Sequence, residues 1–171
     1  MEILLFVVSL PTQNGTARMR IWRALKNCGA AVLRDGVYVL PQRAGHADVL
    51  QVIASDVMAN EGTALIFAAQ SPDHLDIPAL FDRGEAYQAL QEQIQHLVAS
   101  LHSVKKEDAL KQARKLRKQL HAVMGTDFFT HALQAQVVQE LQQLDLQIAR
   151  LGEPHEPAFV QGQLPLLRLA D

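Results

Sequence analysis

The sequence lacks several features that identify common classes of protein. It has a single cysteine, Cys28, so neither an intramolecular disulfide framework nor a cysteine-rich zinc site can form in one chain. No apolar run reaches the ~20 residues of a membrane-spanning helix, and the apolar start follows Glu2 rather than a basic leader. We therefore expect a soluble, cytoplasmic protein with no membrane association.

The chain also lacks an overall excess of basic charge. Its formal net charge is -2, which excludes a uniformly basic nucleic-acid binder. The charge is nevertheless uneven: between Lys105 and His121, seven Lys or Arg stand against two acidic residues, a local excess of +5. A role in binding nucleic acid would therefore depend on local clusters of this kind.

The first part of the chain alternates between strand and helix patterns. The apolar run over residues 2–9 predicts a central strand covered on both faces. Apolar residues at helical spacing over residues 16–28, after a capping Asn14 or Thr16 and before Gly29, predict a helix. Two β-prone runs then flank Asp35-Gly36, a pair that suits a tight hairpin because both positions can take positive φ.

A second helix and a last strand complete this part. The helical pattern runs through Val49, Val52, Ile53 and Val57, and residues 63–69 predict another strand. The resulting order, βαββαβ, is that of the ferredoxin-like split motif. We expect an α+β fold in which residues 1–70 form a ferredoxin-like domain and residues 71–83 form a linker.

The remaining residues predict helices that pack on one another. Apolar side chains recur at alternating spacings of three and four, which is typical of a narrow helix–helix seam. The positions are Tyr87, Leu90, Ile94, Leu97 and Leu101, then Ala109, Ala113, Leu116, Leu120 and Val123, then Val137, Leu141, Leu144, Ile148 and Leu151. Residues 84–151 therefore predict a three-helix, coiled-coil-like segment that packs internally or forms a homodimer, with an extended tail over residues 152–171.

Several strings of residues carry a resemblance to a known family. They are Ser9-Leu-Pro-Thr, Arg18-Met-Arg-Ile-Trp-Arg-Ala-Leu, Gly29-Ala-Ala-Val-Leu-Arg-Asp-Gly-Val-Tyr-Val-Leu-Pro, Phe81-Asp-Arg with Tyr87, Gln112-Ala-Arg-Lys-Leu-Arg-Lys, and Asp127-Phe-Phe. In this order they resemble the amino-terminal domain of the ChrB family of chromate-resistance regulators. The resemblance implies a regulator that binds operator DNA and is released by the chromate oxyanion.

Longer members of that family carry a second, carboxy-terminal domain. The end of this sequence, over residues 164–171, resembles the connection that leads into it. Chromate sensing that needs the second domain is therefore not implied for the residues present here.

Two basic clusters are candidates for contact with DNA. At 100° per residue, Lys111, Arg114, Lys115 and Lys118 fall opposite the apolar seam of their helix, where they can meet phosphates; the alternative is a solvated helix face. The second cluster is Arg20, Arg23 and Lys26, with Arg18 one turn before Trp22. We expect Trp22 in the core, the alternative being stacking on a guanidinium or a base.

A site for a small anion has weaker support. The loop 11–15 precedes a helix amino terminus, whose N–H groups can bind an oxyanion, but it has no phosphate-loop signature and otherwise reads as an ordinary connection. We expect no cofactor other than chromate as an effector.

The sequence offers little for catalysis. A metal-dependent nuclease of the kind used in CRISPR adaptation, also ferredoxin-like, binds its cation through an Asp at the end of the first strand, where this chain has Val8-Ser9-Leu10. The seven histidines include no helical pair at i and i+4. We expect no metal site and no catalytic residue; the alternatives to a DNA-binding regulator are a dimerisation or protein-interaction module and, less favoured, a nuclease.

Overall fold

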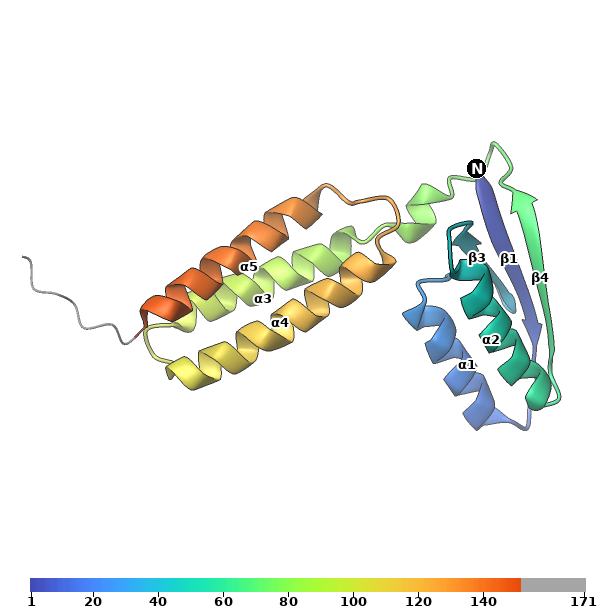
Figure 1. The fold of residues 1–171 in the computed structure, drawn as a ribbon, viewed down its shortest axis with the longest axis horizontal. Helices are drawn as coiled ribbons and strands as arrows, with labels where there is room; N and C mark the ends of the chain where they lie inside the picture. The colour runs from blue at the N-terminus through green and yellow to red at the C-terminus, as the bar shows by residue number, and fades with distance from the viewer. Residues whose placement is uncertain (152–171) are drawn as a thin grey trace, which may run out of the picture.

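A computed structural model of the chain describes residues 1–151, which form a mixed α+β structure (Figure 1). The elements are β1 (Glu2–Ser9), α1 (Gly15–Asn27), β2 (Ala31–Arg34), β3 (Val37–Pro41), α2 (His46–Ala59), β4 (Thr63–Gln70), the 3-10 helix η1 (Pro78–Phe81), α3 (Gly84–Ser100), α4 (Lys106–Thr126) and α5 (Leu133–Arg150). The tail predicted over residues 152–171 lies outside the described residues. No helix in the described part is both long and apolar enough to cross a membrane.

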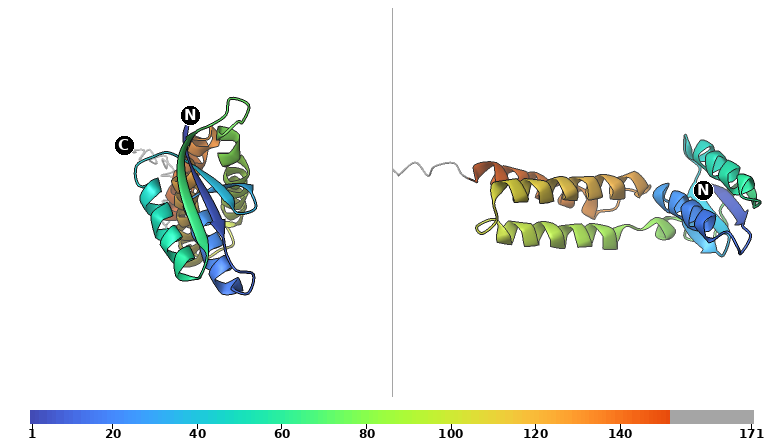
Figure 2. Two further views of the ribbon diagram at one scale, coloured as in Figure 1. Left: turned by 90° about the vertical axis from the view of Figure 1, so that its right-hand side faces the viewer. Right: turned by 90° about the horizontal axis from the view of Figure 1, so that it is seen from below.

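The four strands form one antiparallel sheet with β1 at its centre. The strand order is β2-β3-β1-β4, and β1 pairs along its length with β3 and β4. Helices α1 and α2 lie against one face of this sheet (Figure 1). Figure 2 shows the three long helices side by side, with the α/β unit beyond one end of the bundle.

Helix α1 begins and ends where its sequence signals predict. The side chain of Asn14 accepts a hydrogen bond from the backbone N–H of Ala17 at 3.1 Å, which satisfies one of the free donors of the first turn. Ala17, Ile21 and Leu25 are buried against the sheet. Gly29, at φ 82°, then ends the helix in a left-handed conformation.

The hairpin between β2 and β3 differs in detail from the predicted turn. Gly36 has φ 72°, but Asp35 keeps a negative φ, so the expectation of two positive φ values is wrong. The hairpin itself is confirmed, since Arg34 pairs with Val37 across Asp35-Gly36, and the register of the two strands shifts between Val32 and Arg34. Gly36 is also required by space: a Cβ there would lie 2.6 Å from the backbone oxygen of Val8.

Two further segments differ from their predicted patterns. The buried residues of α2 are Leu50, Ile53, Ala54 and Val57, whose spacing of i, i+3, i+4 and i+7 puts them on the one face that meets the sheet. Val52 lies outside this face and is 71% exposed. Within the predicted linker, residues 71–83, Ile77 and Phe81 belong to the core of the α/β unit.

The three long helices bury their apolar seams against one another. The predicted positions from Tyr87 to Leu120 and from Val137 to Ile148 form a second core, separate from that of the α/β unit, with Val123 and Leu151 half-buried at its edges. Helix α4 continues through Gly125 to Thr126, slightly beyond the predicted break.

Replacing Gly36 by Val is expected to destabilise the fold by roughly 2–4 kcal/mol, since a β-branched residue would take positive φ and press on β1. Urea denaturation of the variant measures this cost. Gly15→Ala is the control, because no atom lies within 4 Å of a Cβ at that position. Equal stability of both variants would show that the hairpin does not pack on β1 in this way.

Replacing Leu116 by Asp should destabilise the bundle by more than about 3 kcal/mol, because the side chain is 5% exposed and a carboxylate would be buried in the seam. Arg117→Ala, on the neighbouring exposed position, should cost at most about 1 kcal/mol. Thermal unfolding followed by circular dichroism distinguishes the two, and a small effect of both would mean that the seam is open to solvent.

Candidate nucleic-acid interface

The outer face of α4 carries the first predicted cluster, and the structure brings all four residues together. Lys111, Arg114, Lys115 and Lys118 are exposed on the side opposite the seam. Among residues 1–151, the only one of the four in an ion pair is Lys111, whose Nζ lies 3.5 Å from Asp108; both side chains are largely exposed, so this pair is weak. We call these four residues the α4 basic face.

Two other cations of the same segment have structural partners. Arg117 forms a two-point ion pair with Asp145 of α5, at 2.8 and 3.1 Å, and these hydrogen bonds raise the pKa of the guanidinium. Lys106 donates through Nζ to the backbone oxygens of Ala149 and Leu151, both at 2.8 Å, at the end of α5. Helical spacing already leaves these two cations outside the α4 basic face, but the sequence does not show their partners, which lie far along the chain.

The second predicted cluster is divided by an ion pair. Arg20 donates to both carboxylate oxygens of Asp56 on α2, at 2.6 and 2.9 Å, and this hydrogen bonding lowers the pKa of Asp56. Asn60 also donates to the same carboxylate at 3.2 Å. Arg20 is therefore held between α1 and α2, and the structure does not combine it with Arg23 and Lys26 into one unpaired face.

Trp22 is not a core residue, which corrects the expectation from the sequence. Its side chain is 42% exposed, because it lies outside the Ala17, Ile21, Leu25 stripe that meets the sheet. The Nζ of Lys26 lies 5.1 Å from the centre of the indole ring, a cation–π contact. One turn earlier, Arg18 donates to the backbone oxygens of Leu10 and Pro11 at 3.4 and 3.3 Å.

The loop before α1 gains no support as an anion site. One of the helix N–H groups that an oxyanion would use already donates to Asn14. The adjacent hollow is lined by Pro11 and Thr12 together with Glu61, whose carboxylate repels an anion. Chromate binding at this loop stays a prediction.

The joint between the two units was not predicted from the sequence. Phe128, from the turn between α4 and α5, is 7% exposed and packs edge-on against Phe81 and His46, with ring centres 5.3 and 5.0 Å apart. Arg43 lies over its ring, at 5.5 Å from the centre, and donates to its backbone oxygen. A Cβ on Gly29 would lie 2.9 Å from the tip of the ring, so a glycine there makes room for it.

Polar contacts surround this joint. The Tyr87 hydroxyl donates to Asp127 at 2.8 Å, and burial together with this hydrogen bond raises the pKa of the phenol. The Nε of Arg83 donates to Thr126 at 3.2 Å. The strings 81–83 with Tyr87 and 127–129, which are distant in the sequence and carry part of the family resemblance, therefore meet at one place.

The described residues contain no group of three or more His, Cys, Asp or Glu side chains arranged to hold a metal ion. Cys28 is half-buried, and burial raises the pKa of its thiol, so the reactive thiolate is disfavoured.

Comparison with known proteins identifies the family of the chain. The model described as Protein ChrB, N-terminal matches residues 18–154, and the chain belongs to this family. It is 34% identical over 165 residues to Protein ChrB of Cupriavidus metallidurans, a match that covers 95% of this chain. The chain spans about half the length of that relative, 51%. No solved structure shows significant similarity to the chain.

Truncating Phe128 to Ala should lower stability by roughly 3–5 kcal/mol, because it removes the aromatic side chain that joins the two cores. Phe129→Ala is the matched control: this neighbour is 38% exposed and should cost clearly less. Chemical denaturation of both variants tests the joint, and equal losses would show that Phe128 has no special role in holding the units together.

Proposed function

We propose that this chain is the DNA-binding part of a chromate-resistance regulator and that it contacts DNA phosphates through the α4 basic face. The observation that carries the proposal is the separation of cations on α4: Arg117 and Lys106 have structural partners, whereas Arg114, Lys115 and Lys118 have no ion pair within residues 1–151. Membership of the ChrB amino-terminal family supports the assignment to chromate resistance.

The geometry of α4 favours contact with the DNA backbone over reading of bases. Lys118 lies seven residues after Lys111, a rise of about 10 Å along the helix, so the side chains of the α4 basic face can reach several phosphates. The opposite side of α4 is committed to the bundle through Ala109, Ala113 and Leu116. Contacts of this kind position a protein on DNA and supply affinity that depends strongly on salt, but they carry no sequence information.

Chromate control belongs to the same proposal. Its support is membership of the family, since none of the charged or polar side chains in residues 1–151 is buried in the way that a dedicated oxyanion site requires. Release of DNA by chromate is therefore measured separately from DNA affinity.

We also assign the α/β unit to the ferredoxin-like class and the chain to the cytoplasm. The βαββαβ order, with β1 and β3 in the middle of an antiparallel sheet, supports the class. A single thiol supports a reducing compartment.

A second candidate function is self-association, and the surface that favours it is the sheet rather than the helices. The seams of α3, α4 and α5 are used inside the bundle. On the sheet, Leu65 and Phe67 are 56% and 50% exposed and pair in register with half-buried Val7 and Leu5. A second copy of the chain would cover this apolar patch, so Phe67→Lys should reduce any dimer seen by sedimentation.

Replacing Lys111, Arg114, Lys115 and Lys118 together by Gln tests the main proposal. Gln is nearly as good a helix former, so the bundle should stay folded, while up to four phosphate contacts are lost. We expect weaker binding to promoter DNA from the chain's own operon. The slope of log K against log salt should fall by up to about 3.6, at roughly 0.9 per phosphate.

The control for this variant removes cations that have partners. Arg20→Gln with Arg117→Gln lowers the charge of the same protein without touching the α4 basic face, and it should change the salt slope little. Chromate is added in a parallel series to measure release. Unchanged affinity and salt slope in the folded quadruple variant would show that the α4 basic face does not contact DNA. Arg23 and Lys26 would then be the next candidates, if the chain binds DNA at all.

A further inference from the structure

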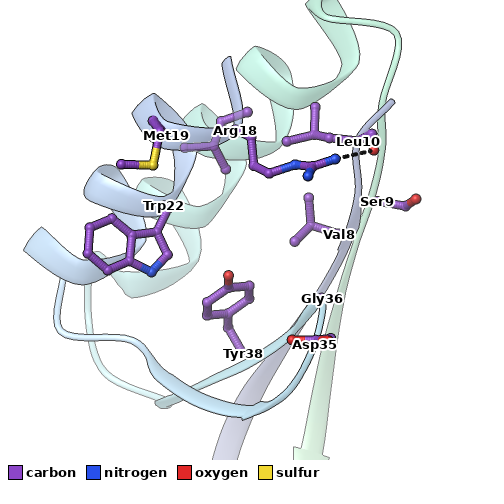
Figure 3. A pocket seen from close by; sticks show the side chains of 10 residues that line it. Val8, Ser9, Leu10, Arg18, Met19, Trp22, Asp35, Gly36 and Tyr38 are labelled. Carbon is purple, nitrogen blue, oxygen red and sulfur yellow. Dashed lines mark hydrogen bonds between the residues drawn. The ribbon is translucent and has the colours of Figure 1, made fainter. Parts of the chain in front are cut away.

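A cleft opens between α1, the β2–β3 hairpin and the end of β1 (Figure 3). Its volume is about 630 Å³, which is within the range of small-molecule sites. A tetrahedral oxyanion would leave most of this space empty. The cleft therefore has room for a ligand larger than a tetrahedral oxyanion.

Two aromatic side chains from different elements face this space. Trp22 comes from α1 and Tyr38 from β3, and Figure 3 shows the Tyr38 hydroxyl pointing into the gap between them. The hydrogen bond drawn in that figure runs from Arg18 to Leu10, so the Tyr38 hydroxyl and the indole N–H have no partner among the lining residues. Two planar surfaces with two free donors suit a flat, polar ring.

Cations stand on both sides of the exposed indole. Arg18 and Lys26 lie four residues before and after Trp22, on the same side of α1. The bonds from Arg18 to the Leu10 and Pro11 carbonyls, at 3.4 and 3.3 Å, are long, so a phosphate can replace them at little cost. An aromatic ring between two cations is the arrangement that binds a base together with its phosphate.

We propose that this cleft binds a nucleobase that carries a phosphate, with the base stacked on Trp22 and Tyr38 and the phosphate held by Arg18 or Lys26. The carboxylate of Asp35 at the hairpin end accepts a hydrogen bond from an amino group of the base. The source is either an unpaired base of single-stranded DNA or a free nucleotide. The DNA source rests on the proposed function, whereas binding of a free nucleotide does not.

The Tyr38 hydroxyl is suited to donate to the sugar or phosphate of such a nucleotide, since it lies in the plane of the ring on which the base stacks. Burial raises the pKa of this phenol, and the charge of Asp35 raises it further, so the hydroxyl stays protonated at neutral pH.

The chain reports on this site by itself, because Trp22 is its single tryptophan. We would titrate the full chain with dAMP, a single-stranded oligonucleotide and the matching duplex while recording tryptophan fluorescence. Saturable quenching by dAMP or by the single strand is expected, with a smaller response to the duplex, whose bases are stacked. Quenching by dAMP alone assigns the site to a free nucleotide, and quenching by the strand alone assigns it to DNA.

Two variants keep the reporter and alter the cleft. Tyr38→Leu should weaken binding of the quenching ligand by at least about tenfold, since stacking is lost, and Arg18→Gln should reduce the salt dependence. Arg150→Gln, which removes an exposed cation in the last turn of α5, outside the lining, is the control and should leave both unchanged. If Tyr38→Leu fails the folding check by circular dichroism, Arg18→Gln alone decides.

The proposal fails if neither dAMP nor the single strand quenches Trp22, whatever the duplex does, or if folded Tyr38→Leu and Arg18→Gln bind as the unmodified chain does. The quadruple Gln variant of the α4 basic face separates this failure from failure of the proposed function. It should lose duplex affinity and retain quenching by dAMP.

Discussion

The contact of Phe128 with the α/β unit is the interaction on which the arrangement of this molecule depends. Residues 1–151 contain two separate hydrophobic cores, one in the α/β unit and one in the helical bundle. Phe128 comes from a turn of the bundle but belongs to the core of the α/β unit, where Phe81 and Arg43 contact its ring. Burial of one aromatic side chain contributes a few kcal/mol, and the other contacts of the joint, polar or made by the partly exposed Phe129, add to it.

A fixed joint matters because the two candidate surfaces lie on different units. The α4 basic face is on the bundle, and the cleft beside Trp22 is on the α/β unit. If Phe128 holds the two units in this arrangement, the two surfaces keep a constant separation, and DNA bound as we propose would meet both in one geometry. Arg117 and Lys106 have a related role within the bundle, since both connect α4 to α5.

Local patterns in the sequence predicted the elements well and their partners poorly. Apolar spacing predicts helices such as α3 and α5, because the apolar residues of each seam recur in consecutive turns of one continuous segment. The sequence predicts Trp22 in the core and Arg20 in an unpaired basic cluster, and it predicts nothing for Phe128. The structure differs because residues far along the chain surround these side chains. Asp56 lies 36 residues from Arg20, and Phe128 meets Arg43 across 85 residues. Helical spacing predicted the four residues of the α4 basic face, and the structure adds that Arg117 and Lys106, outside that face, bind α5.

Chemical footprinting of lysines tests the central claim most directly. Reductive methylation of the full chain, with and without duplex promoter DNA, reports how accessible each Lys is when read by mass spectrometry. The account predicts that DNA protects Lys111, Lys115 and Lys118, while Lys106, already engaged with α5, changes little. Equal modification of those three lysines in the free and bound states, or protection confined to Lys26, would contradict the assignment of the DNA contact to α4.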